Sequence, residues 1–308
     1  MRHIIKTFMW ILVSFTAVFA LSGCHLAMFE PKGAIATEQA RLIIIATILM
    51  LVIVVPVIVM TVFIAWRYRA SNKKAVYEPN WAHSVKLEIL WWTIPCVIIL
   101  ILATIAWVTS HTLDPYRSLD SDKKPLTIQA VALDWKWVFI YPEQGIATIN
   151  YIEIPENTPI SFEIASQGPM NALWIPQLGG QIYAMAGMRT RLHLIADTRG
   201  IYDGSSANYS GPGFAEMTFK VKAESAEDFA RWVTTVKRSP NAMSSEVFDA
   251  LLAPSINLPV QYFSSVAPNL FNHEIMKFMM PMGSSMDMSL SDMSDSSPHS
   301  HQTTHVAE

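Results

Sequence analysis

The sequence predicts a membrane-anchored α + β protein with a hairpin of two transmembrane helices, an antiparallel β-sandwich or barrel, and a short helical annex. The first observation is a pair of long apolar runs in the N-terminal third, and the second is a region of alternating apolar and polar residues that follows them. The third is composition, since 51% of the 308 residues are hydrophobic and only 15% are charged. Soluble domains carry about 25% charged residues, so a purely cytosolic domain is disfavoured. The same apolar content rules out a disordered chain.

The charge and the rarer residue types exclude several functional classes. The net charge is −3 and no patch of Lys and Arg stands outside one short loop, so we expect no nucleic-acid partner. The two cysteines cannot form a disulfide framework or a thiolate-rich metal site by themselves. We find no phosphate-binding glycine loop, no Ser/His/Asp order and no paired catalytic carboxylates. The sequence therefore indicates no self-contained active site.

Residues 1–23 are predicted to be a lipoprotein signal peptide. Positive residues precede the apolar run from Phe8 to Leu21, which is shorter than the roughly 20 residues that a spanning helix needs. The run closes in Leu-Ser-Gly-Cys, which is similar to the bacterial lipoprotein processing box. We therefore expect Cys24 to be acylated and to begin the mature chain outside the cytoplasm. The alternative is a plain signal peptide with a chance cysteine.

Residues 24–112 are predicted to form the transmembrane hairpin. The two spans cover about residues 42–66 and 89–108, each long enough to cross a hydrocarbon core of ~30 Å. The loop from Arg67 to Lys86 is basic, so the positive-inside rule places it in the cytoplasm. Both termini then lie in the periplasm, and the chain is expected to be a multi-pass lipoprotein of a bacterial inner membrane.

Glu88 lies at the predicted cytoplasmic start of the second span. A carboxylate at a helix N-terminus can simply complement the helix dipole. The functional alternative is a proton path or a subunit contact, because ionisable groups near membrane depth are seldom idle.

Residues 125–223 are predicted to be the β domain. From Val131 to Tyr141 the apolar residues, Trp135 and Trp137 among them, fall on one parity, which predicts one half-buried strand. Short strands at this spacing, separated by turn residues, are typical of an antiparallel sandwich or barrel. Further strands are expected over residues 149–154, 160–164, 192–194 and 217–221.

Residues 224–281 are predicted to be a helical, aromatic-rich annex. Ser225 is placed to cap a helix, with Asp228 three residues further on, and a second short helix is expected over 246–252. The tail, residues 282–308, consists mainly of Ser, Met, Asp and His and is expected to be disordered. Its methionines and histidines could hold copper weakly, since thioether and imidazole suit this metal.

Four motifs follow one another along the chain. The two-span hairpin carries Glu88-x-x-Trp91-Trp92, the aromatic strand reads Asp-Trp-Lys-Trp from residue 134, and the segments 171–176 and 206–217 come later. This order closely resembles subunit II of the haem–copper respiratory oxidases over about residues 20–280. The resemblance implies a cupredoxin-like Greek-key sandwich on the membrane hairpin. In cytochrome c oxidases it also implies a dinuclear copper centre.

The resemblance gives the positions of the copper ligands, and this chain lacks most of them. The family pattern is a His before a Phe/Trp-Val-Pro stretch, then Cys-x-x-x-Cys-Gly-x-x-His-x-x-Met, with a Glu that supplies a carbonyl. Copper of this type requires thiolates and imidazoles, whereas a serine hydroxyl is hard and a phenyl ring has no lone pair. We therefore expect this subunit to bind no metal or other cofactor. The lost positions are Asn171, Ser206, Asn208, Ser210 and Phe214, and only Met217 keeps the family ligand.

A subunit II without this copper centre is similar to the cytochrome o-type ubiquinol oxidases. The resemblance then implies a proton-translocating complex that oxidises ubiquinol and reduces oxygen at haems and copper in subunit I, with smaller subunits III and IV as further partners. This chain would be a non-catalytic subunit in contact with membrane lipid. Glu88 would lie at the entrance of a proton path in subunit I. Trp135 and Trp137 would be sandwich core or interface, and His193 an edge or surface residue.

One alternative stays open at this point. The chain could be an independent membrane-anchored periplasmic lipoprotein that binds copper through its tail histidines, His299, His301 and His305. It would then show tail-dependent metal affinity and no stable association with a multi-span partner. The hydrophobic hairpin argues against this, because one lipid and one helix would anchor a soluble binder.

Overall fold

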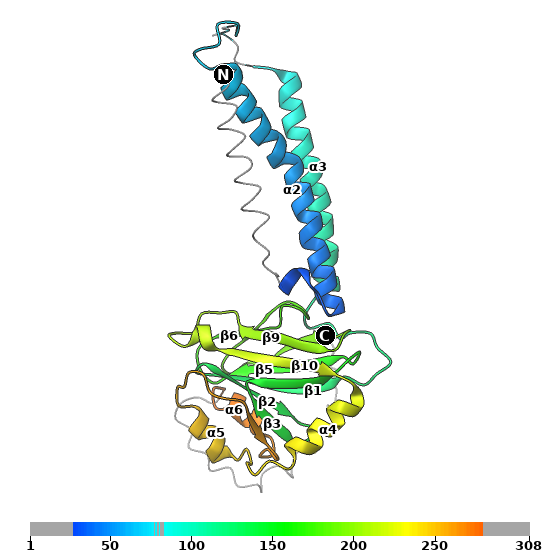
Figure 1. The fold of residues 1–308 in the computed structure, drawn as a ribbon, viewed down its shortest axis with the longest axis vertical. Coiled ribbons are helices and arrows are strands. Elements are labelled where there is room, and N and C mark those ends of the chain that lie inside the picture. The colour runs from blue at the N-terminus through cyan, green and yellow to red at the C-terminus, as the bar shows by residue number, and fades with distance from the viewer. Residues whose placement is uncertain (1–26, 77, 79, 81–82, 280–308) are drawn as a thin grey trace, which may run out of the picture.

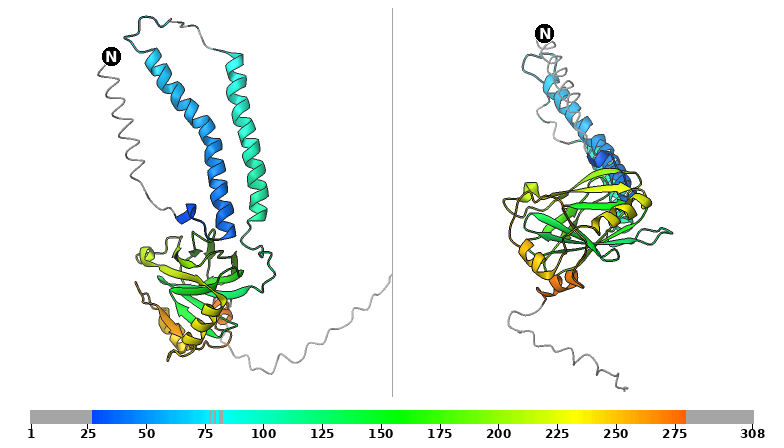
Figure 2. Two further views of the ribbon diagram at one scale, coloured as in Figure 1. Left: turned by 45° about the vertical axis from the view of Figure 1, so that its right-hand side comes forward. Right: turned by 60° about the horizontal axis from the view of Figure 1, so that its bottom comes forward.

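Two long helices rise from one end of a β-sandwich, and short helices cover other faces of it (Figures 1 and 2). The structure is a computed structural model. The predicted signal peptide with Cys24 and the tail from residue 282 lie outside the described residues. The described residues are 27–76, 78, 80 and 83–279.

The hairpin consists of α2 (Ala34–Arg67) and α3 (Val85–Thr112), preceded by the short turn η1 (Ala27–Phe29). Both long helices are apolar and long enough to cross a membrane, and the two predicted spans lie inside them. A helix of 28 residues is about 42 Å long at 1.5 Å per residue, which exceeds a hydrocarbon core of ~30 Å. Their apolar side chains are mostly exposed, as expected of helices that face lipid or a partner.

The sandwich is built from two sheets. The six-stranded sheet has the order β11-β3-β2-β1-β5-β8, and the five-stranded sheet has the order β4-β10-β9-β6-β7. The strands are β1 (Leu126–Leu133), β2 (Lys136–Tyr141), β3 (Ile146–Ile149), β4 (Tyr151–Pro155), β5 (Ile160–Ser166), β6 (Asn171–Trp174), β7 (Ile182–Ala184), β8 (Thr190–Leu194), β9 (Gly200–Ser206), β10 (Thr218–Glu224) and β11 (Gln261–Phe263).

The predicted sandwich is confirmed, but the expectation that it is purely antiparallel is wrong. Strand β1 pairs with β5 in parallel, and β4 pairs with β10 in parallel. Period-two alternation fixes which face of a strand is buried but not the direction of its neighbour. Both parallel pairs join strands that are far apart in the chain, so no hairpin turn between them marks their direction in the sequence.

The expected single strand from Val131 to Tyr141 is also wrong, because the chain turns at Asp134 and Trp135. Leu133 is paired with Lys136, so β1 and β2 form a tight hairpin. Trp135 has a φ of 62°, a left-handed backbone conformation that belongs to the turn and not to a strand. After the turn the faces exchange, and Trp137 enters the sandwich interior whereas Leu133 faces the annex.

The annex contains α4 (Ala226–Val236), α5 (Ser245–Leu251) and α6 (Leu270–Met276), and it also adds β11 to the six-stranded sheet. The predicted cap of α4 is confirmed, since the backbone N–H of Asp228 donates to the Ser225 hydroxyl at 3.1 Å. Helix α4 packs its aromatic face against the sandwich core, and α5 and α6 enclose a second apolar core on the outer face of the six-stranded sheet.

Candidate functional site

The predicted ligand positions gather where β6 begins and where β9 passes into β10. Asn171 is the first residue of β6, and Ser206 is the last of β9. The two strands are paired, so the sheet brings these side chains together. Met217 follows the short turn η2 (Phe214–Glu216) and leads into β10, and its backbone carbonyl accepts from the N–H of Ser206 at 3.0 Å.

Asn171 and Ser206 form a closed polar pair. The Ser206 hydroxyl donates to the Asn171 Oδ1 at 2.9 Å, and the Asn171 Nδ2 donates to the carbonyl of Pro169 at 2.9 Å. Ser206 is only 6% exposed and Asn171 only 1% exposed. Buried polar groups are stable when they are paired in this way. The pair therefore satisfies itself without a metal ion.

Three of the remaining positions are held by protein contacts, whereas the Ser210 hydroxyl is buried without a hydrogen-bond partner among the described residues. The Asn208 Nδ2 donates to the carbonyl of Met170 at 2.8 Å, which ties the loop to the start of β6. The Phe214 ring meets the Tyr209 ring edge-on, with 5.6 Å between centroids. Met217 is 1% exposed and belongs to the sandwich core. This arrangement is a packed loop with hydroxyl, amide, phenyl and thioether groups.

Trp135 braces this loop from the β1–β2 turn. Its indole N–H donates to the carbonyl of Ser210 at 3.2 Å. A Cβ atom at Gly213 would lie 2.5 Å from the indole ring, and one at Gly211 would lie 3.1 Å from it. Glycine is therefore required at Gly213 by the close approach, and Gly211 has in addition a φ of 116°.

The donor set does not fit a dinuclear copper centre. Such a centre requires thiolates and imidazoles, and one buried thioether cannot replace them. Among the described residues, no group of three or more His, Cys, Asp and Glu is placed to hold a metal ion. His193, the histidine of the β domain, lies on β8 at the edge of the six-stranded sheet, in agreement with the expectation that it is an edge or surface residue.

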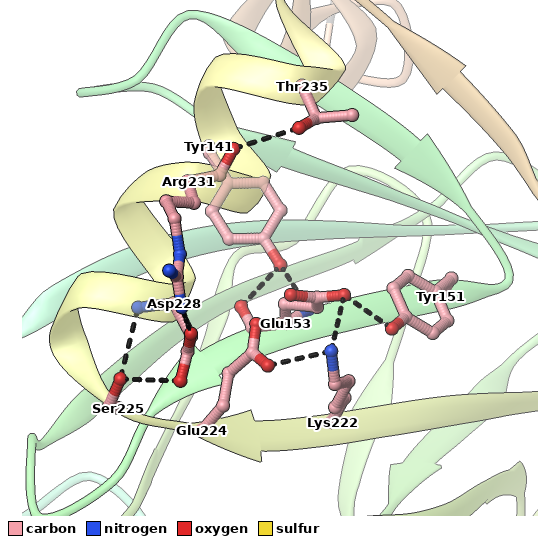
Figure 3. A network of polar contacts seen from close by, with 9 residues as sticks. All are labelled: Tyr141, Tyr151, Glu153, Lys222, Glu224, Ser225, Asp228, Arg231 and Thr235. Carbon is pink, nitrogen blue, oxygen red and sulfur yellow. Dashed lines mark hydrogen bonds and ion pairs between the residues drawn. The ribbon is translucent and has the colours of Figure 1, made fainter.

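A second polar cluster lies between α4 and the adjacent ends of β4 and β10 (Figure 3). Glu153 of β4 is 4% exposed at its side chain, and its Oε1 accepts from the Tyr151 hydroxyl at 2.6 Å. The Lys222 Nζ lies 2.7 Å from Glu224 Oε2 and 3.6 Å from Glu153 Oε1. The Tyr141 hydroxyl donates to the carbonyl of Glu153 at 2.9 Å, which links the two sheets.

This cluster holds two carboxyl groups with opposite pKa shifts. Burial and the neighbouring Glu224 carboxyl raise the pKa of Glu153 to about 7. The pKa of Glu224 is lowered, because Glu153 donates to it and Lys222 lies beside it. Burial raises the pKa of Tyr151 and of Tyr262 on β11, so both hydroxyls stay protonated. Glu153 is therefore the group that can carry the shared proton near neutral pH.

Glu88 lies in the first turn of α3, as expected for the start of the second span. Its Oε1 is 2.5 Å from the His83 Nδ1, and its side chain is 38% exposed. The contact adds to the favourable position of a carboxylate at a helix N-terminus. The start of α3 lies at the end of the hairpin away from the sandwich (Figure 1), so Glu88, in the first turn of this helix, is not part of the loop that carries the ligand positions.

Sequence reasoning missed the bracing role of Trp135 and the burial of Glu153. The glycines at 211 and 213 were a signal for a close backbone approach, although they do not identify the ring that approaches. The alternation in β4 places Glu153 on a polar face, which predicts solvent exposure. The annex helix α4 covers that face instead, and strand periodicity alone cannot predict this cover.

The annex matches the family described as the COX aromatic rich motif over residues 237–282. The chain is 54% identical over 266 residues to cytochrome bo(3) ubiquinol oxidase subunit 2 of Pseudomonas aeruginosa. The aligned region covers 86% of this chain and 80% of that protein. It is 39% identical over 266 residues to quinol oxidase subunit 2 of Bacillus subtilis, covering 85% of this chain and 83% of that protein. Among solved structures, it is similar to the periplasmic domain of subunit II of cytochrome oxidase of Bradyrhizobium japonicum, with 23% identity, a TM-score of 0.36 and coverage of 39% of this chain and 96% of that chain.

Proposed function

This chain belongs to the subunit 2 family of ubiquinol and quinol oxidases, and from that premise we propose that it is a non-catalytic subunit that carries no dinuclear copper. In this role it associates with the haem–copper subunit I and with smaller subunits. Subunit I oxidises ubiquinol, reduces oxygen and translocates protons with its own haems and copper. A quinol delivers electrons within the bilayer, so the sandwich needs no electron relay.

The observation that carries the proposal is the closed pair of Asn171 and Ser206. In this pair a 2.9 Å hydrogen bond occupies the place that the family resemblance assigns to an imidazole and a thiolate. The contact of the Phe214 ring with Tyr209 and the hydrogen bond from Trp135 support it, because both are contacts that the loop makes with protein groups in place of a metal ion. The relatives' names are those of oxidase subunits, so the alternative of an independent copper-binding lipoprotein is not favoured.

The proposed location is the inner membrane of a bacterium. The basic loop between the two spans favours a cytoplasmic turn, which puts the sandwich and both termini in the periplasm. Cys24 is then on the correct side for acylation. A shift in intact mass that a Cys24→Ala variant loses would support this, whereas an unmodified Cys24 would contradict it.

Glu88 is proposed to lie at the entrance of a proton path in subunit I. Its support is a position at the cytoplasmic end of α3 and a side chain that is 38% exposed. Glu88→Gln should slow quinol-driven proton release by the assembled complex. The amount of complex that assembles should stay close to that of the wild type. Equal proton release by both forms would reduce Glu88 to a helix-dipole contact.

The test of the function is oxygen uptake by the complex that copurifies with the full chain. Rapid, inhibitor-sensitive uptake with ubiquinol and none with reduced cytochrome c is expected. Uptake from cytochrome c would show that the ligand positions are misassigned or that another centre replaces them. Failure of any oxidase to copurify would contradict the subunit role itself.

Copper binding gives a second test on the same complex. The wild-type chain should contain no copper in its sandwich, because the donor set lacks thiolate and imidazole. The variant Asn171→His, Ser206→Cys, Ser210→Cys and Phe214→His supplies those donors beside Met217. It should gain near-stoichiometric copper with strong visible absorption. Tight copper binding by the wild-type sandwich would contradict the proposal.

A further inference from the structure

A pocket of about 340 Å³ lies at the junction between the hairpin and the sandwich. Its walls come from the start of α2, from the segment that follows α3, and from the edge strand β8. Figure 1 and the left view of Figure 2 show the lower ends of α2 and α3 side by side above the sandwich at this junction. The pocket belongs to neither the loop that carries the ligand positions nor the Glu153 cluster.

The pocket lies at the depth of lipid headgroups. Gln39 of α2 lines it and is three residues before the apolar span that begins at Leu42. Thr112 of α3 also lines it and is four residues beyond the end of the second span. At 1.5 Å per residue both positions are about 5 Å outside the hydrocarbon core. Headgroups occupy this layer, since a bilayer is ~40–45 Å thick with them and ~30 Å without.

The lining combines an apolar wall with groups of both charges. Ile35, Leu113 and Leu192 supply aliphatic surface, and the polar side carries Asp114, Arg117 and Asp120 among others. The Arg117 guanidinium is 3.9 Å from Asp120 Oδ2, and the two side chains are 55% and 97% exposed. An exposed pair at this distance is weak, so both groups remain open to a ligand.

The charge balance selects the class of ligand. Burial and the nearby Arg191 lower the pKa of His193, so this lining residue is neutral at pH 7 and adds no positive charge. Among the described residues that line the pocket, the guanidinium of Arg117 faces the carboxylates of Asp114 and Asp120, and Arg191 lies outside this lining. A purely anionic headgroup would meet net negative charge, whereas a headgroup with both an ammonium and a phosphate can satisfy both kinds of group.

We propose that this pocket binds the headgroup of an ethanolamine phospholipid. The primary ammonium lies between Asp114 and Asp120, the phosphate meets Arg117, and the glycerol and upper chain carbons lie against the apolar wall. A primary ammonium donates three hydrogen bonds, and a trimethylammonium donates none. The site therefore distinguishes ethanolamine from choline headgroups.

The experiment is lipid retention by the full chain in detergent, measured by native mass spectrometry. Phosphatidylethanolamine and phosphatidylcholine with the same acyl chains are added in turn. One ethanolamine lipid should bind at about tenfold lower concentration than the choline lipid, a difference of about 1.4 kcal/mol. The double variant Asp114→Asn/Asp120→Asn should reduce this preference to less than threefold. Asn keeps the acceptor that the backbone N–H of Tyr116 uses at 2.9 Å from Asp114 Oδ1, so the turn is preserved.

Matched variants separate the site from general effects of charge. Asp122→Asn removes an exposed acid from the same linker that does not line the pocket, and it should keep the full preference. Arg117→Gln should weaken both lipids alike, because both carry a phosphate. Equal retention of the two lipids by the wild type would overturn the proposal. So would a loss of the ethanolamine preference in Asp122→Asn as large as that in the double variant. Tighter binding of phosphatidylglycerol or of a ubiquinol would also overturn it. Oxygen uptake is not measured, so this result is independent of the proposed oxidase role.

Discussion

At the scale of single residues, burial separates Glu153 from the other carboxylates of the sandwich. Its neighbours come from three other strands, with Tyr141 on β2, Lys222 and Glu224 on β10, and Tyr262 on β11, and Trp232 of α4 packs against the Tyr141 and Tyr262 rings. These groups exclude water but supply only one cation close to two carboxyl groups. Burial is the larger cause of the raised pKa of Glu153, and the neighbouring Glu224 carboxyl adds to it because a proton on Glu153 relieves their repulsion.

This raised pKa predicts how the stability of the sandwich depends on pH. The pKa of Glu153 is about 7 in the folded protein and has an ordinary value of 4.5, so the folded state binds the proton more tightly. Its contribution is complete below pH 4.5 and is lost as the pH rises to about 7. Because the lowered pKa of Glu224 acts in the opposite sense, we expect a net loss on the order of 2 kcal/mol.

The measurement is thermal unfolding of the full chain in detergent between pH 5 and 8, for the wild type and Glu153→Gln. The variant keeps a neutral side chain at every pH, so its unfolding temperature should change less with pH than that of the wild type. Glu227→Gln, on the exposed side of α4, is the matched control and should follow the wild type. Parallel curves for Glu153→Gln and the wild type would show that Glu153 does not titrate in this range.

At the scale of elements, the sequence predicted what periodicity can specify and no more. The spans, the capped helix α4 and the strands around 151–155 and 160–166 follow from apolar spacing and turn residues. The turn at Asp134 and Trp135 carries neither Gly nor Asn, and one Asp is a weak turn signal inside a continuous alternating pattern, so periodicity alone does not separate β1 from β2. The loss of the copper ligands was readable from residue types, but the hydrogen bond that replaces them depends on β6 lying beside β9.

Lys136 shows how a residue on an apparently polar parity can join two elements. It is 1% exposed, and its ammonium donates to the carbonyl of Ala253 and the hydroxyl of Ser255, both at 2.8 Å. A third bond goes to the carbonyl of Asp134 at 3.2 Å. The β1–β2 hairpin is therefore tied to the annex by one side chain, and burial lowers the pKa of this ammonium.

Replacing this tie should loosen the annex. Lys136→Met removes three hydrogen bonds whose acceptors are only partly buried, and a typical hydrogen bond contributes about 0.5–1.5 kcal/mol net, so a loss of about 2–4 kcal/mol is expected. Limited proteolysis should cut the variant faster between α5 and β11. Lys124→Met is the control, since Lys124 is 79% exposed in a surface pair with Glu143. Unchanged resistance of Lys136→Met would mean that apolar packing alone holds the annex.

At the scale of the whole molecule, the junction of hairpin and sandwich is made largely by backbone. The backbone N–H of Lys32 donates to the carbonyl of Gln177 at 2.8 Å, and the backbone carbonyl of Lys32 accepts from the N–H of Asp197 at 2.8 Å. Apolar and polar patterning cannot reveal contacts of this kind, because they depend little on side-chain type. The sequence therefore predicted both parts of the molecule but not the geometry that joins them.

Gly33 is the position where this junction is most sensitive to a side chain. A Cβ atom there would lie 2.2 Å from the carbonyl oxygen of Ile195, which is backbone and cannot rotate away. Gly33→Ala must therefore displace the start of α2 from the sandwich, at a cost of about 1–3 kcal/mol.

This displacement would change the position of the sandwich on a partner that binds the hairpin and the sandwich together. We expect two- to tenfold less quinol-driven oxygen uptake per chain in purified membranes. Ala34→Ser, one residue further on and exposed, should leave uptake unchanged. Full uptake and an unchanged unfolding temperature in Gly33→Ala would show that the hairpin and the sandwich act as independent units.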